Sequence, residues 1–161
     1  MQPSVEPAPQ LTPTRLLALL DKAKAFPLLK RHHPDVVDDV DFVAYGNKPS
    51  ISDFNDFEIR LEEAYRFNKE DTLVFRASLK NKTLQPITYR PGSLAVRIGN
   101  RVYHQSVSDA SGIIPANAET TVYFAITGTP DGGRNEISVK NNFTVLLERL
   151  PPEPSARSKA K

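Results

Sequence analysis

The chain has 161 residues, which is enough for one ordinary domain with a buried core. Its net charge is +2, but residues 35–150 carry 13 Lys and Arg against 16 Asp and Glu, so the basic surplus lies toward the ends. A nucleic-acid-binding domain concentrates positive charge on its folded part, and we therefore expect no nucleic-acid partner. The lack of cysteine excludes disulfides, thiolate metal sites and a cysteine nucleophile.

Prolines gather toward both ends of the chain. We expect flexible tails at residues 1–11 and 151–161, because such segments bury too little apolar surface to order themselves. No run approaches the roughly 18 apolar residues of a membrane span, so we expect none. Residues 1–10 resemble the linker that follows a removed signal peptide or anchor, and if one has been removed we expect an extracytoplasmic location.

Residues 12–26 predict one N-terminal helix, which with its connector occupies residues 12–34. Thr12 can cap it and Pro13 suits its first position, whereas Pro27 is expected to end it. We expect the helix to dock on the flank of the domain, with a partner-binding helix as the alternative. The apolar residues at helical spacing are Leu16, Leu19, Leu20, Ala23 and Phe26.

From residue 35 the apolar period becomes two, which is typical of strands with one wet face. A first strand is expected at 39–45. In the next run Glu63 falls on the apolar parity, which indicates a bulge or the rim of a sandwich at that position. The apolar residues of this run that share one parity are Phe57, Ile59, Leu61, Tyr65 and Phe67.

Residues 68–71 form a turn, and the chain returns along residues 73–79 as the second half of an antiparallel hairpin. The Gly99-Asn100 pair predicts another hairpin, followed by a strand at 122–126 that residues 115–120 set in register. After a long turn at 127–135, further strands are expected at 137–139 and 143–147. About seven short strands with this spacing predict an all-β fold, residues 35–150 forming one antiparallel β-sandwich.

Four stretches resemble one family of domains. They are a strand ending in an Asn-polar-Thr turn, a Pro-flanked link containing Tyr, a Gly hairpin carrying Tyr, and a Pro-Ala lead-in to a Val-x-Phe strand, at residues 81–83, 86–91, 99–103 and 115–124. Over residues 57–147 the chain resembles the bacterial telokin-like, immunoglobulin-like accessory domains of surface proteins, which include proteins encoded with type IV pilus machinery. The resemblance implies an immunoglobulin-like sandwich and offers no catalytic residues.

Two clusters could suggest metal binding. His32, His33 and Asp35 precede an acidic run at 38–41, but adjacent histidines rarely point at one ion, and the run is spaced like a solvated strand edge. Residues 53–58 are acidic but lack the glycine and the layout of a calcium loop. We expect no metal and no cofactor.

Enzymatic signatures are equally weak. His104, Ser106 and Asp109 contain the letters of a hydrolytic triad, but all three come from one strand and its exit. The glycines at 132–133 lie beside Arg134, yet a strand pattern follows them where a phosphate loop needs a helix. We expect a protein that is not an enzyme.

The residues we select for partner binding are Arg97, Tyr103 and Tyr123. If Val102 and Val122 point inward, both tyrosines point outward, and Tyr and Arg are the residue types that anchor interfaces; ordinary cross-strand tyrosines are the alternative. We therefore expect a non-catalytic binding or assembly module of a bacterial cell-surface or periplasmic apparatus, contacting a protein partner or itself. A virion decoration or tail protein is the main alternative, and a periplasmic ligand-binding domain or an enzyme also stays open.

Overall fold

The computed structural model of the chain describes residues 11–46, 48, 50–127 and 135–151. The expected tails lie almost entirely outside these residues, as does most of the turn expected at 127–135. The described part is mostly β, with antiparallel sheets and two α-helices, and this confirms the coarse form of the predicted fold. It contains eleven strands, several of them only two residues long, so the expected number of about seven is not confirmed.

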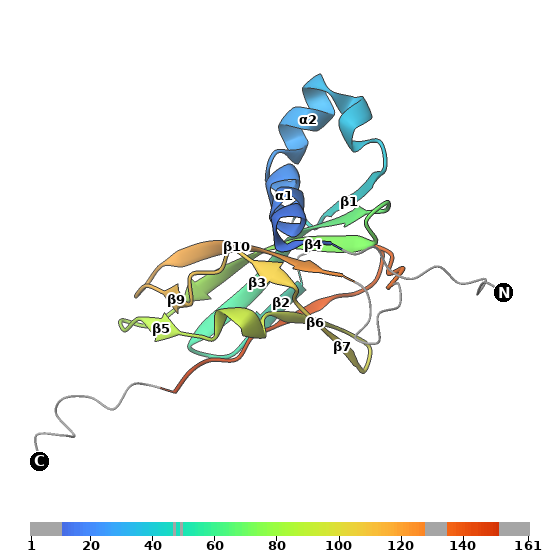
Figure 1. The fold of residues 1–161 in the computed structure, drawn as a ribbon. Coiled ribbons are helices and arrows are strands. Elements are labelled where there is room, and N and C mark those ends of the chain that lie inside the picture. Colours follow the sequence, from blue (N-terminus) through green and yellow to red (C-terminus); the bar gives the residue numbers. More distant parts are fainter. Residues whose placement is uncertain (1–10, 47, 49, 128–134, 152–161) are drawn as a thin grey trace, which may run out of the picture.

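A six-stranded antiparallel sheet forms the centre of the molecule (Figure 1). Its strands lie in the order β1-β3-β4-β10-β8, and β2 pairs with the same edge of β3 as β1 does. The strands of this sheet are β1 (Val40–Ala44), β2 (Ser50–Asp53), β3 (Phe57–Phe67), β4 (Thr72–Asn81), β8 (Val107–Ser108) and β10 (Glu119–Ile126).

The predicted bulge in β3 is confirmed, since the register against β4 shifts between Leu61 and Glu63. Before the shift Ile59 and Leu61 face the core between the sheets; after it Ala64 takes that side. Tyr65 and Phe67, which share the sequence parity of Leu61, therefore point to the opposite face of the sheet. The extra residue lets β3 supply apolar side chains to two separate cores.

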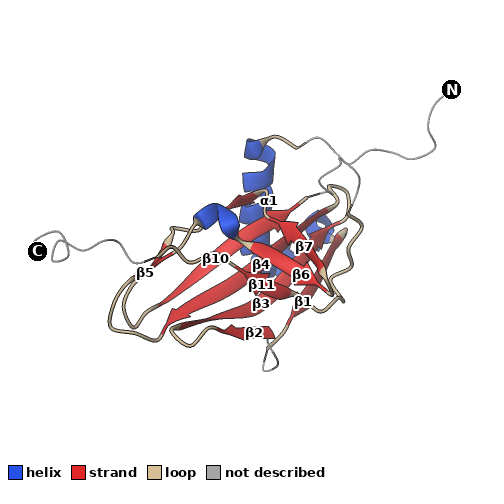
Figure 2. Ribbon diagram, turned by 90° about the horizontal axis from the view of Figure 1, so that it is seen from below, coloured by secondary structure: helices blue, strands red, loops and turns tan. Residues whose placement is uncertain are grey.

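Two small sheets cover one face of the central sheet (Figure 2). Both contribute to one core with β3, β4 and β10, and its largest fully buried side chains include Tyr89, Phe75 and Phe124. The layers thus pack face to face, as in a sandwich. The small sheets comprise β11 (Thr144–Leu146), β6 (Ala95–Ile98) and β7 (Arg101–His104) in one, and β5 (Ile87–Thr88) and β9 (Ile113–Ile114) in the other, with a 3-10 turn, η2 (Pro91–Ser93), between β5 and β6.

The strand expected at 137–139 is wrong. Ile137 and Val139 are buried in the core, but no strand forms there. The backbone N–H groups of Asn135 and Glu136 donate to the carboxylate of Asp71 at 2.6 and 2.9 Å, so a side chain takes the place of a neighbouring strand. Alternating apolar residues indicate that a segment is buried on one side. Here the segment is buried, but its backbone does not pair with a neighbouring strand.

Helix α1 (Pro13–Lys24) covers the other face of the central sheet, and the second helical segment extends away from the sheet beyond it (Figure 1). In α1 the side chain of Thr12 accepts a hydrogen bond from the backbone N–H of Arg15, as its capping role predicts. Leu19, Leu20 and Ala23 pack on Tyr65, Phe67, Val74 and Ala125, which confirms that the helix docks on the domain. These contacts form a second core.

Pro27 does not end the helical segment, and that prediction is wrong. A second helix, α2 (Phe26–His32), begins one residue after Ala25 caps α1, and Pro27 lies in its first turn, where its missing N–H costs no hydrogen bond. A 3-10 turn, η1 (Pro34–Val37), then leads into β1. Of the described helices, none combines the length and the apolar character that crossing a bilayer requires.

Candidate functional site

The three residues selected from the sequence do not form one surface. Arg97 and Tyr103 lie on the β6-β7 hairpin in one outer layer, whereas Tyr123 lies on the helix-facing side of β10. Tyr123 does point away from the core between the sheets, as predicted, but α1 lies over it: the Lys24 ammonium is 5.2 Å from the centroid of its ring. Burial raises the pKa of the Tyr123 phenol. The ring belongs to the helix-sheet contact.

Tyr103 faces the opposite way from the prediction. Across the two-residue Gly99-Asn100 turn, Tyr103 pairs with the buried Val96, and Val102 pairs with the exposed Arg97. A two-residue turn pairs odd positions of one strand with even positions of the other, so the inward parity changes across it. Tyr103 therefore packs against the core, and Val102 is 42% exposed. The hairpin itself and the exposure of Arg97 are as predicted.

The structure instead shows a groove along the outer edge of β1. Its volume is about 790 Å³, and we call it the β1 groove. One wall is formed by α2 and the other by the irregular segment that leads into β11, while β1 lies between them. The lining residues are Phe26 and Lys30 of α2, Val40–Val43 of β1, and Ser138, Val139 and Lys140 of the irregular segment.

The backbone of β1 is unpaired on its groove side. In the β1-β3 ladder, Tyr45 N–H donates to the carbonyl of Glu62, and Asn68 N–H donates to that of Asp39, so odd-numbered positions of β1 bond to β3. Because bonding alternates along an antiparallel pair, the N–H and C=O groups of Val40, Phe42 and Ala44 point away from β3. Among the described residues, β3 is the only strand that pairs with β1.

Aromatic side chains build the helix side of the groove. Phe42 stacks on Phe26 with ring centroids 4.8 Å apart, and it lies 5.0 Å from Tyr65. Despite these contacts Phe42 remains 38% exposed. The hydroxyl of Tyr65 donates to Glu63, and burial together with this hydrogen bond raises the pKa of the phenol far above its ordinary value. Tyr65 thus stays neutral and supports the partly open ring of Phe42.

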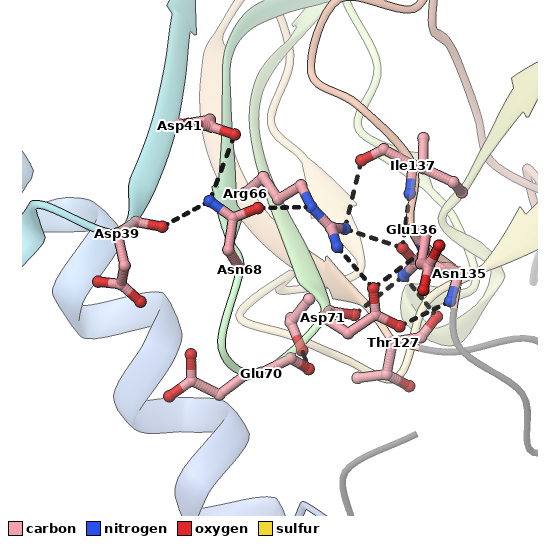
Figure 3. Close-up of polar contacts among 11 residues, drawn as sticks. Asp39, Asp41, Arg66, Asn68, Glu70, Asp71, Thr127, Asn135, Glu136 and Ile137 are labelled. Atoms are coloured by element: carbon pink, nitrogen blue, oxygen red, sulfur yellow. Dashed lines mark hydrogen bonds and ion pairs between the residues drawn. The ribbon is translucent and has the colours of Figure 1, made fainter. Parts of the chain in front are cut away.

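A buried polar network fixes the strand and the far wall relative to each other (Figure 3). Asn68 donates to the carbonyl of Asp39 at 2.6 Å and accepts from Arg66 Nε at 2.8 Å. The guanidinium of Arg66 also donates to Asp71 at 2.7 Å and to the carbonyl of Ile137 at 3.3 Å. Since Asp71 is fully buried and also binds the backbone of Asn135, the segment before Ser138 is tied to the β3-β4 turn.

The candidate catalytic groups do not assemble. Asp109 pairs with Lys24 at 2.9 Å and accepts from the backbone N–H of Tyr123, while Ser106 shares a hydrogen bond with Thr127. Across the part of the chain that the structure describes, no three His, Cys, Asp or Glu side chains are placed to hold a metal ion. Two of the acidic residues at 53–58 form ion pairs with basic side chains: Asp53 pairs with Lys82, and Asp56 pairs with Arg149. The groups that converge at the β1 groove are backbone amides, aromatic rings, two lysines and the carboxylate of Asp41.

Sequence reasoning predicted β1 itself but missed the groove. The exposed apolar residue at Phe42 within an acidic run is the one local signal, and it does not reveal which edge of the strand is unpaired. Pairing depends on the strand order of the whole sheet, which no local pattern encodes.

Comparisons with known proteins add little to this description. No family model matches the chain, and no curated protein matches it. Among solved structures, the chain is similar to the crystal structure of a functionally unknown protein from Listeria monocytogenes EGD-e, with 10% sequence identity and a TM-score of 0.35. That similarity covers 69% of this chain and 87% of the Listeria chain.

Proposed function

We propose that the protein is a non-catalytic binding or assembly module, an immunoglobulin-like β-sandwich that contacts a protein partner at the β1 groove. The observation that carries this proposal is the unpaired backbone edge of β1 on the floor of a groove with aromatic and basic walls. An exposed sheet edge is a template for pairing, and folded proteins commonly cover or blunt such edges. A partner that covers this edge would also cover the exposed part of the Phe42 ring.

The proposed setting is a bacterial cell-surface or periplasmic apparatus, with a pilus-associated protein as the most specific form. Its support is the sequence resemblance over residues 57–147. The groove is consistent with any setting in which the domain holds another protein, and so the binding role is proposed separately from the location.

The binding role is tested by photocross-linking in cells of the source organism. The photoreactive amino acid p-benzoylphenylalanine replaces Lys30 in the groove. In a matched control it replaces Leu84, which follows the C-terminal end of β4 and is 78% exposed. We expect a discrete adduct from the groove position alone, identified by mass spectrometry and reproduced with the purified partner. Equal adducts from both positions, or none from the groove, would refute a partner site there.

A further inference from the structure

We propose that the β1 groove binds an extended segment of another protein as an added β-strand, one that alternates apolar side chains and carries carboxylates. The inference deepens the proposed function and depends on it, because it names the kind of partner and the way it is held. In strand addition, main-chain hydrogen bonds supply affinity and the side-chain contacts on each wall supply specificity.

The backbone of β1 provides the hydrogen-bonding register. Val40 and Phe42 each present one N–H and one C=O to the groove, and Ala44 continues the same unpaired edge just beyond the groove lining. No hydrogen bond within the described residues occupies any of these groups. A partner strand that bonds to alternate residues would engage all three positions over the five-residue length of β1, about 17 Å. The proline-rich tails of this chain are poor occupants, since proline lacks the N–H that a ladder requires.

The two walls define the side chains that fit. Phe26 and Phe42 line the helix wall, and Val139, which is 5% exposed, lines the opposite wall, so apolar residues suit both faces of the added strand. Lys30 and Lys140 lie on opposite walls, are exposed, and are in no ion pair within the described residues. Asp41 is the one acidic residue in the lining. The lysine excess favours a segment that carries carboxylates.

The walls also favour a single segment over a second copy of the chain as occupant. In edge-to-edge pairing, each copy would have to fit its α2 and its Ser138–Lys140 segment beside the same elements of the other copy. Pairing of the two β1 strands would also bring their acidic residues, Asp41 in each copy, near one another. A single extended segment meets neither obstacle.

The test uses the full chain and the synthetic peptide Ac-Glu-Val-Thr-Val-Thr-Val-Glu-NH₂ as the probe. Fluorescence anisotropy of a labelled peptide measures affinity, and hydrogen exchange followed by NMR measures protection of individual amides. We expect the peptide to slow exchange at Val40, Phe42 and Ala44 by about tenfold or more, and to leave the already bonded Asp41 and Val43 unchanged. A peptide with Lys at both ends, and one N-methylated on the amides that face β1, are expected to bind more weakly.

A variant pair isolates the backbone contribution. Ala44→Pro removes one N–H of the unpaired edge, where proline is compatible with a strand, and Ala44→Ser retains that N–H. We expect Ala44→Pro to weaken peptide binding by about tenfold and Ala44→Ser to leave it within about twofold. Far-UV circular dichroism and the melting temperature establish that both variants fold.

Three results would overturn strand addition: no saturable binding up to about 1 mM peptide, binding without protection of the three amides, or equal binding by the Pro and Ser variants. A dimer in analytical ultracentrifugation that Ala44→Pro disrupts would assign the edge to a second copy instead. If cross-linking identifies a partner at Lys30 and that purified partner binds the Pro variant as well as the parent, the binding role stands and strand addition alone fails.

Discussion

Replacing Asp71 with asparagine should remove a large part of the stability of the fold. The carboxylate is fully buried and accepts from Arg66 at 2.7 Å and from the backbone N–H groups of Asn135 and Glu136. Asparagine tolerates the left-handed backbone of this position, where φ is 51°, so the substitution tests charge and acceptors and avoids added backbone strain. It leaves the guanidinium of Arg66, whose side chain is 10% exposed, without its counter-charge.

The magnitude follows from the cost of breaking a buried ion pair by removing one partner, about 3–5 kcal/mol. For a chain of this length each kcal/mol lowers the melting temperature by about 2–4 °C, which gives a fall of about 6–20 °C for Asp71→Asn. Urea titration followed by far-UV circular dichroism measures the free energy of unfolding, and thermal melting checks the temperature shift.

The matched control is Glu148→Gln, which removes the same kind of charge from the Arg90–Glu148 pair. Its two side chains are 59% and 61% exposed, and an ion pair this open to water contributes little. We expect no resolvable change in the urea midpoint for this variant. Equal effects of the two substitutions would refute the reasoning that burial makes Asp71 important.

Leu20 of α1 is 2% exposed, so Leu20→Ala should cost about 2–5 kcal/mol in the urea titration, and a cost below about 1 kcal/mol would mean that the helix does not pack on the sheet. Burial works against ionisation of Glu63, but hydrogen bonds from Arg76 and a neighbouring tyrosine hold its pKa below the ordinary value of 4.5. Its folded pKa is thus below its unfolded pKa, so its stabilisation is complete above the unfolded value and is lost as pH falls through the folded one. In the Glu63→Gln variant, the free energy of unfolding should therefore fall less steeply as the pH is lowered through this range. An unchanged pH dependence would contradict the pairing of Glu63 with Arg76. Tyr103→Ala should lower the melting temperature because the ring packs on the core, whereas Arg97→Ala should change the free energy of unfolding by less than about 0.5 kcal/mol. A larger effect of Arg97→Ala than of Tyr103→Ala would mean that Tyr103 points outward.

Local patterns predicted the parts of the fold that depend on near neighbours in sequence. The β3-β4 hairpin, its bulge at Glu63 and the cap at Thr12 all depend on residues within one strand, turn or helix end. The expectation for Pro27 is wrong because proline is equally suited to follow one helix and to begin another. The expectation that Val102 points inward is wrong because the two-residue turn reverses the inward parity.

The candidate site depends on contacts that are distant in sequence. Asp71 lies in a turn that the sequence predicts, but its partner Asn135 is 64 residues away, and no short pattern links the two. Likewise Phe42 alone resembles any exposed residue of an acidic strand. Its significance comes from Phe26 on a helix and Val139 on an irregular segment, which only the assembled fold brings to the same groove.

The bulge in β3 sets which residues reach each of the two cores. If the same sequence alternated strictly through Glu62 and Glu63, Tyr65 and Phe67 would point into the space between the sheets, and Ala64 and Arg66 would point toward α1. The helix would then meet a methyl group and a guanidinium where it now meets two aromatic rings, and Asp71 would lose its cation. The helix contact, the buried ion pair and the support of the β1 groove therefore all depend on the one register shift, whereas deletion of the extra residue Glu62 would leave each of these side chains on its present face.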